Sequence, residues 1–420
     1  MIEKYNFHWR EGFFYNFPKK RFLFNDIVEE IESKQIVSLI GLRRTGKTTI
    51  LKQVIDHLIK SKKVKREYIL FYSFDEEQPK IGEIVTEYET KLGKEILNIK
   101  DKIYIFLDEI QKLKNWQNQV KYYYDNYQNI KFFVSGSSSL FIKKHTRESL
   151  AGRIYEFVLN PLSFEEFLIF KNKGQMLKKK NLFEDTLKKE FLSYQKRQFI
   201  EIIDESEERV AKYIKTMIEK IVYQDIPKIF PIENEELLMR ILKIIASNPG
   251  MLSDYGSLSK ELGISRVTLS NYFFYLNESF LIKKLYNFSR NMLTSEKKMK
   301  KFYLTTTSFF PFLNNEIDES KLIENLIVTF VDAKFFWRTP QKYEVDVILK
   351  EKGKIIPIEV KYKEYISKKD TKNLLRFCEK FNVEEAVMIT QSKSNEEIFK
   401  LKSGAKVRIK FIPVWKFLLQ

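Results

Sequence analysis

Residues 41–48 carry the clearest chemical pattern in the chain. Their sequence, Gly-Leu-Arg-Arg-Thr-Gly-Lys-Thr, fits the phosphate-binding motif G-x-x-x-x-G-K-[ST] in full. An apolar run from Ile36 to Ile40 precedes the motif and predicts a buried strand, and a helix-like segment follows from Thr49. Glycines in such a turn let backbone N–H groups point at a phosphate chain, and the helix N-terminus adds partial positive charge. The pattern therefore predicts a nucleotide site.

The side chains of this motif predict how ATP and Mg²⁺ would be held. Lys47 is expected to act in catalysis by reaching the β- and γ-phosphates, and the Thr48 hydroxyl is expected to ligate Mg²⁺. The residues that we expect around the nucleotide are Gly41, Leu42, Arg43, Arg44, Thr45, Gly46, Lys47, Thr48 and Thr49.

Two adjacent acids, Asp108 and Glu109, follow a second apolar run further along the chain. A continuous apolar run is typical of a parallel strand that is covered on both faces. The carboxyl ends of such strands border the crevice where α/β sheets bind ligands. We therefore expect Asp108 to hold the Mg²⁺ shell and Glu109 to polarise the attacking water; an ordinary acidic turn is the alternative.

A third group of charged residues lies near the C-terminus. Glu324 falls on a predicted helix, Asp346 on a predicted strand, and Glu359 and Lys361 on the next strand. Residues two apart on a strand share a face, so Glu359 and Lys361 are expected to be neighbours. Acids from adjacent strands beside a lysine can hold Mg²⁺ and activate water at a phosphodiester. A Glu-x-Lys pair alone also occurs on ordinary surface strands.

The segments between these sites predict the helices and the hairpin that connect them. Residues 168–235 are rich in Lys and Glu, have helical spacing, and are expected to form a helical lid or linker. Residues 257–265 predict a helix, a glycine turn and a serine cap, and a second helix starts at Arg266, which is the helix-turn-helix pattern. A basic hairpin that suits the phosphate backbone of DNA follows, with Lys283, Lys284, Arg290, Lys297, Lys298, Lys300 and Lys301. Packing on the nucleotide domain or binding a protein is the alternative use of this module.

From the phosphate motif through Asn160-Pro-Leu-Ser-Phe-Glu-Glu-Phe167, the chain is similar to AAA-type ATPases of uncharacterised bacterial and archaeal proteins. In that family a winged-helix segment and a C-terminal nuclease-like domain follow. The C-terminal residues look like a PD-(D/E)xK nuclease core, in which Asp346 and Glu359 match the metal ligands, Lys361 the catalytic lysine and Glu324 the helix acid.

The resemblance implies an α/β fold class with four parts. These are a P-loop NTPase domain with a parallel sheet, a helical linker, a winged helix-turn-helix and an α/β nuclease-like domain. We expect their bounds to be 1–167, 168–235, 236–304 and 305–420.

Two further candidates lie between the acids and the end of the ATPase segment. A strand ending in serines resembles the sensor position of AAA+ ATPases, for which Ser137 is the first choice and Ser135 and Ser138 follow; a serine-rich turn is the alternative. Arg153 is a catalytic candidate for stabilising transition-state charge, in cis or from a neighbouring subunit. A surface salt bridge is the alternative for Arg153.

The composition limits the class of protein. A chain of 420 residues predicts two or three domains, and a net charge of +18 with a pI near 9.4 favours polyanions such as DNA. A lysine-rich composition alone would give the same charge. The single Cys378 excludes an intramolecular disulfide framework, and no stretch approaches 18 apolar residues. A cytoplasmic protein with no membrane contact is expected.

These patterns together predict an ATPase whose hydrolysis drives or gates a DNA-associated, nucleolytic activity. ATP and Mg²⁺ are the expected cofactors, and DNA and further copies of the chain are the partners to consider. The alternative is a non-cleaving nucleotide switch whose nuclease-like domain only binds protein or nucleic acid.

Overall fold

The computed structural model describes residues 2–136, 150–314, 316–351 and 353–420. The chain divides into two compact units, Met1–Pro161 and Leu162–Gln420, which are described separately. The division falls before the predicted boundary at 167/168, because the helix that begins at Phe164 packs with the second unit. The division into four domains stays a prediction.

The first unit is built on a five-stranded parallel sheet with the order β2-β3-β4-β1-β5. Every residue of the three central strands is buried, which explains their continuous apolar runs. The strands are β1 (Ile36–Ile40), β2 (Ile69–Ser73), β3 (Ile103–Asp108), β4 (Ile130–Gly136) and β5 (Ile154–Val158).

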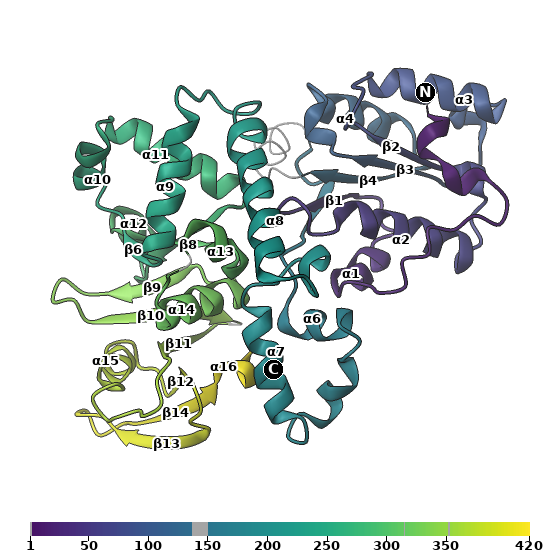
Figure 1. The fold of residues 1–420 in the computed structure, drawn as a ribbon. Coiled ribbons are helices and arrows are strands. Elements are labelled where there is room, and N and C mark those ends of the chain that lie inside the picture. Colours follow the sequence, from purple (N-terminus) through teal and green to yellow (C-terminus); the bar gives the residue numbers. More distant parts are fainter. Residues whose placement is uncertain (1, 137–149, 315, 352) are drawn as a thin grey trace. The chain divides into compact units, whose positions relative to one another are not determined.

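Helices cover both faces of this sheet (Figure 1). Those on one face are α1 (Leu23–Glu29) and α2 (Lys47–Lys60), and those on the other are α3 (Ile81–Leu92) and α4 (Trp116–Asn126). The core on the α1–α2 face contains Leu51, Val54 and Leu58 of α2 packed against Phe106 and Phe133 of the strands. Because α2 is fixed to the sheet in this way, the phosphate motif at its N-terminus is fixed as well.

The N-terminal aromatic segment packs along the edge strand β2. Asn6 exchanges two hydrogen bonds with the backbone of Phe71, at 2.7 and 2.9 Å, as a further strand would. The indole N–H of Trp9 donates to the carbonyl of Ile69, and its ring stacks on Tyr88. These contacts cover an edge that would otherwise be open to pairing with another chain.

The second unit begins with a group of helices and contains more helices between its strands. Side-chain caps begin several of them, including Ser163 on α6 and Asp318 on α14. The helices are α6 (Phe164–Phe170), α7 (Glu184–Tyr194), α8 (Glu207–Lys220), α9 (Glu235–Ser247), α10 (Tyr255–Leu262), α11 (Arg266–Glu278), α12 (Met292–Lys297), α13 (Phe310–Leu313), α14 (Glu319–Phe330), α15 (Lys372–Phe381) and α16 (Val414–Phe417).

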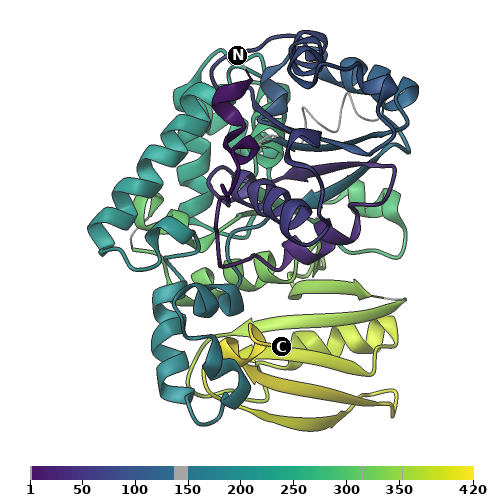
Figure 2. The same ribbon diagram turned by 90° about the vertical axis from the view of Figure 1, so that its right-hand side faces the viewer.

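One mixed sheet of nine strands runs through the second unit, with the order β13-β14-β12-β11-β10-β9-β7-β8-β6 (Figure 2, green to yellow). Its strands are β6 (Met251–Leu252), β7 (Ile282–Asn287), β8 (Lys300–Leu304), β9 (Phe335–Arg338), β10 (Glu344–Glu351), β11 (Lys354–Lys361), β12 (Glu385–Thr390), β13 (Asn395–Lys400) and β14 (Lys406–Pro413). Leu374, Phe377 and Cys378 of α15 pack on Val345 and Ile348 of β10.

The nine-stranded sheet passes through the predicted boundary at 304/305. Helices α10 and α11 lie where the helix-turn-helix pattern places two helices, and Ser265 caps α11 by accepting from the backbone N–H of Thr268 at 3.0 Å. The hairpin of β7 and β8 follows them, but β7 also pairs in parallel with β9. The hairpin is therefore an internal part of the sheet and not a free wing.

Candidate functional site

The phosphate motif forms the turn between β1 and α2 in the first unit. Three of its residues have positive φ angles: Gly41 at 149°, Arg44 at 63° and Gly46 at 100°. Such angles are readily adopted by glycine and allow consecutive backbone N–H groups to face one side of a turn. The backbone thus has the form that a phosphate chain requires.

Lys47 lies inside this turn. Its ammonium donates to the carbonyls of Gly41 and Leu42 at 3.1 and 3.0 Å, and only 5% of the residue is exposed. Thr45 is also buried and donates from its hydroxyl to the Leu42 carbonyl at 2.8 Å. The lysine charge is therefore held within the curve of the turn, where phosphates are expected.

Thr48 and Asp108, which the sequence predicted as Mg²⁺ ligands, are in contact. The Thr48 hydroxyl donates to Asp108 Oδ2 at 2.7 Å, and the Ser135 hydroxyl donates to Asp108 Oδ1. Burial and then the charge of Glu109 raise the pKa of Asp108. A hydroxyl beside a buried carboxylate at a phosphate turn fits a hard divalent cation, whose charge would offset the loss of hydration.

Glu109 begins the segment after β3 with a left-handed φ of 54°. Its backbone N–H donates to Ser135 Oγ at 3.3 Å, and the amide of Gln111 donates to Glu109 Oε2 at 2.5 Å. The acid pair and one of the predicted serines therefore meet at the ends of β3 and β4. Ser137 and Ser138 lie outside the described residues.

Gln111 and Arg21 support this site and were not predicted from the sequence. The guanidinium of Arg21 donates to the carbonyls of Thr45 and Asn160 at 2.9 and 2.8 Å, and joins the turn to the segment after β5. Gly41 approaches the same segment so closely that a Cβ there would lie 2.3 Å from the carbonyl oxygen of Leu159. Nothing in the sequence around Arg21 indicated that it would bind the phosphate turn, because it is one of several basic residues near the N-terminus.

Arg153, the candidate for transition-state charge, forms an ion pair with Asp125 of α4, and its catalytic role stays a prediction. Its Nε donates to Asp125 Oδ1 at 2.9 Å, and both side chains are about one-third exposed. The geometry is that of the surface salt bridge considered as the alternative.

The predicted C-terminal residues lie around one buried carboxylate cluster in the second unit. Asp346 of β10 and Glu359 of β11 are 8% and 2% exposed, and Lys361 Nζ lies 2.6 Å from Glu359 Oε1. Burial and then Glu324 raise the pKa of Asp346 to about 6, and burial and then Asp346 raise the pKa of Glu359 well above its usual value. Because Val347 of β10 pairs with Ile358 of β11, the next positions, Asp346 and Glu359, are neighbours on the two strands.

Lys301 is part of this cluster, and its predicted place on a DNA-facing wing is wrong. It is 2% exposed, and its ammonium pairs with Glu324 of α14 at 3.3 Å and with Glu344 of β10 at 2.5 Å. Both faces of β8 are buried from Lys301 to Leu304, whereas Lys300 at the start of the strand is partly exposed. A run of lysines does not reveal which of them is buried.

The residues fit a divalent cation only in part. Glu359 Oε2 is buried and accepts no hydrogen bond from any described residue, which is what a metal ligand would show before binding. Against the effect of burial, Lys301 and Lys321 hold the pKa of Glu324 at about 2. Among the described residues, no three or more His, Cys, Asp and Glu side chains could hold a metal ion together. The set of Glu324, Asp346 and Glu359 stays a prediction, and Glu324 is paired with Lys301 and Lys321.

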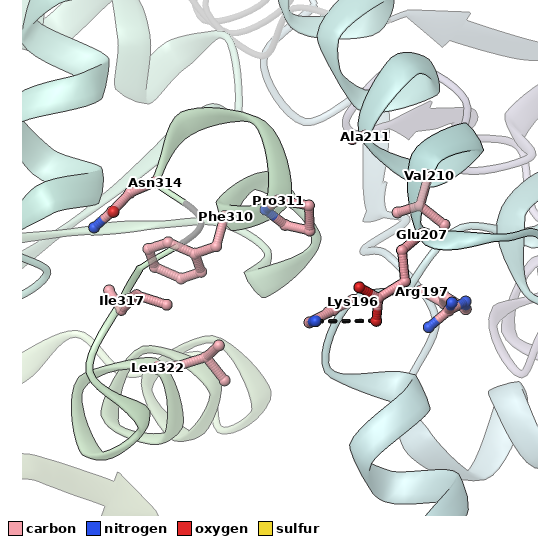
Figure 3. Close-up of a pocket in the computed structure, with 10 residues that line it drawn as sticks. All are labelled: Lys196, Arg197, Glu207, Val210, Ala211, Phe310, Pro311, Asn314, Ile317 and Leu322. Carbon is pink, nitrogen blue, oxygen red and sulfur yellow. Dashed lines mark hydrogen bonds and ion pairs between the residues drawn. The ribbon is translucent and has the colours of Figure 1, made fainter.

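A cavity of about 380 Å³ elsewhere in the second unit contains none of the predicted site residues (Figure 3). Lys196, Arg197 and Glu207 line one side of it, and Lys196 pairs with Glu207 at 3.1 Å. Phe310 and Leu322 line the other side.

Comparison with protein families agrees with the nucleotide site. Residues 33–168 match the AAA domain family, which agrees with the parallel sheet and the phosphate turn of this part of the chain. Residues 201–320 match a domain of unknown function (DUF8612), and residues 319–417 match another (DUF4143).

Relatives of this chain are known in archaea and bacteria. An uncharacterized protein of Methanocaldococcus jannaschii is 28% identical over 96% of this chain and 92% of its own length. An uncharacterized protein of Haemophilus influenzae is 26% identical over 58% of this chain and 60% of its own length. The match to the first of these relatives therefore includes both units of the chain.

Among solved structures, the RuvB Holliday junction branch migration motor of Thermotoga maritima is 17% identical, with a TM-score of 0.30 over 59% of this chain and 81% of that chain. The ORC2 protein of Aeropyrum pernix in its ADP form is 12% identical, with a TM-score of 0.35 over 71% of this chain and 92% of that chain. Within the described part of the chain, no helix has the length and apolar character needed to cross a membrane.

Proposed function

We propose that the first unit binds ATP and hydrolyses it with Mg²⁺, and that hydrolysis drives or gates a DNA-associated activity of the second unit. The observation that carries this proposal is the contact between Thr48 and Asp108, with Lys47 held inside the adjacent turn. These three side chains are the hydroxyl, acid and ammonium that Mg²⁺-dependent phosphoryl transfer requires.

Each residue has a separate task in this proposal. Backbone N–H groups from Gly41 to Thr48 bind the phosphate chain, and Lys47 turns from its loop carbonyls to the β- and γ-phosphates. Thr48 and Asp108 would hold Mg²⁺, which supplies positive charge where negative charge develops in the transition state. Glu109, positioned by Ser135 and Gln111, orients the attacking water.

The DNA-associated part of the proposal is supported by the net charge of +18 and by helices α10 and α11. Asp346, Glu359 and Lys361 are the groups that would cleave a phosphodiester. A second candidate function, a nucleotide switch that does not cleave DNA, is favoured by the ion pairs that Lys301 and Lys321 form with Glu324.

The variant Glu109→Gln tests the ATPase part. We expect ATP hydrolysis to fall by about 100-fold or more while ATP affinity, measured by calorimetry, stays unchanged, because only the base is removed. Glu83→Gln, at an exposed acid of α3, is the matched control and should retain both properties. A chain that binds neither adenine nor guanine nucleotides would disprove the proposal.

The two candidate functions are separated by incubating the full chain with linear and supercoiled DNA. Mg²⁺ or Mn²⁺ is supplied in each case, with and without ATP. Under the nucleolytic reading, DNA is degraded, and Asp346→Ala or Lys361→Ala stops degradation while ATP hydrolysis continues. DNA that stays intact under every condition assigns the second unit to the switch.

A further inference from the structure

Both carboxylate oxygens of Glu324 already have positively charged or hydroxyl partners. Oε1 accepts from the Tyr303 hydroxyl at 2.6 Å and from Lys301 at 3.3 Å, and Oε2 pairs with Lys321 at 2.9 Å. All of these groups except Lys321 are buried. A cation that bound Glu324 would have to displace an ammonium from a site with little access to water.

The backbone at Gly250 also closes the cluster around Glu324. Gly250 has a φ of 78°, and a Cβ at this position would lie 2.8 Å from Tyr303 Oη and 3.0 Å from Glu324 Oε1. Glycine is required here because of its positive φ angle and because a Cβ would clash with Tyr303 and Glu324. The main chain therefore takes the space beside Glu324 that a further ligand would need.

Asp346 and Glu359 differ from Glu324 in this respect. Asp346 Oδ2 accepts from the backbone N–H of Val360 at 2.8 Å, and Glu359 Oε1 pairs with Lys361. Glu359 Oε2 has no described partner although it is buried. Two adjacent carboxylates, one with a free buried oxygen, are the usual protein share of a Mg²⁺ or Mn²⁺ site, because water and substrate supply the other ligands.

We propose that Lys301 serves as a built-in counter-cation that holds Glu324 and Glu344, so that the cluster binds a single divalent cation through Asp346 and Glu359. The ammonium takes the place that a second cation would have among the four acids. Lys301 is then a positioning residue, and Glu324 is not a metal ligand in this chain. This inference requires metal binding only and does not depend on cleavage of DNA.

The test counts bound Mn²⁺ by electron paramagnetic resonance on the full chain without nucleotide. Asp108→Asn is present in every sample, so that an ion held by the first unit does not enter the count. We expect one bound ion, which Asp346→Asn and Glu359→Gln remove and Glu324→Gln retains with an affinity within about threefold. Lys301→Met should tighten Mn²⁺ binding about tenfold or more, because a positive charge near the ion is lost, and Lys301→Arg should resemble the parent.

Several outcomes of this experiment would contradict the proposal about Lys301. Loss of the ion in Glu324→Gln, two bound ions in the parent, or no bound ion in the parent would each overturn the proposal. So would unchanged Mn²⁺ affinity in a folded Lys301→Met variant. If Lys301→Met does not fold, the parent and Glu324→Gln decide the matter alone. Because DNA is absent from the assay, failure of the nuclease candidate leaves this count unaffected.

Discussion

The nucleotide site and the carboxylate cluster are built in opposite ways. The nucleotide site consists mostly of main chain from one continuous segment, Gly41 to Thr48, with Asp108 and Ser135 added from neighbouring strand ends. The carboxylate cluster consists of side chains from four elements, β8, α14, β10 and β11, of which β10 and β11 form a hairpin. A site made of consecutive backbone can be recognised from its motif, whereas a site made of dispersed side chains depends on how the strands pair.

The largest effect is expected from removing the Lys47 ammonium of the nucleotide site. Lys47→Ala should lower ATP hydrolysis by about 100- to 1000-fold, because the phosphates lose a preorganised positive charge. A coupled enzyme assay measures the rate, and Lys60→Ala, at the exposed end of the same helix, is the control. Equal rates in both variants would contradict the assignment of Lys47.

Gly41→Ala tests whether the backbone itself forms the nucleotide site. Its Cβ would meet the Leu159 carbonyl oxygen at 2.3 Å, so we expect the free energy of unfolding of the first unit to fall by about 3 kcal/mol, with loss of ATP binding. Gly152→Ala is the matched control, because Gly152 also has a positive φ but open space around it. That variant should cost about 1 kcal/mol and retain ATP binding, as chemical denaturation and calorimetry would show.

His8 of the first unit differs from the carboxylate cluster of the second unit. The His8 ring is buried without a charge, whereas the cluster buries charges in pairs. Burial lowers the pKa of His8 to about 4 in the folded protein. In the unfolded chain the pKa is near 6.5, so the ring takes up a proton there at a pH at which the folded ring is still neutral. Stability is therefore lost as the pH falls from 6.5 towards 4, by about 3 kcal/mol. His8→Asn should make the unfolding free energy of the first unit less dependent on pH in this range; an unchanged slope would contradict the assignment.

Tyr303→Phe tests the carboxylate cluster as a network of side chains. It removes the hydroxyl that donates to Glu324 Oε1, and we expect a loss of about 2 kcal/mol in the unfolding free energy of the second unit. Tyr365→Phe, at a tyrosine that is 81% exposed, should change it little. Similar melting curves for the two variants would show that the network contributes nothing.

The smallest effect is expected for Arg153→Ala. Its partly exposed ion pair with Asp125 should contribute less than about 1 kcal/mol, and ATP hydrolysis should stay within about twofold of the parent. A loss near 1000-fold would instead assign Arg153 to transition-state stabilisation.

The first unit could be predicted in most respects because its strands are buried on both faces. The run Ile36–Ile40 matches β1 in full, and the predicted acids and Ser135 meet at the ends of β3 and β4. Strand β5 gave no comparable signal, because its residues are only half-buried or exposed and form no apolar run. Arg21 was missed because a contact between a side chain and a distant carbonyl leaves no periodic pattern.

The second unit was predicted less well, for a physical reason. The predicted helix that carries Glu324 and the predicted strands that carry Asp346 and Glu359 are confirmed as α14, β10 and β11. The burial of Lys301 could not be predicted, because both faces of β8 are covered from Lys301 to Leu304 and a run of lysines carries no apolar pattern that would reveal this. The three-acid metal set stays a prediction, and in the structure Lys301 and Lys321 pair with its helix acid, Glu324.

The ion pairs of Lys301 have a consequence for how such chains are inherited. Two separate family descriptions meet near residue 319, yet Lys301 lies before that point and its carboxylate partners lie after it. A recombination event at this junction would combine a buried ammonium with foreign strands and leave it without matching acids. We therefore expect the two segments to be exchanged between genomes as one block.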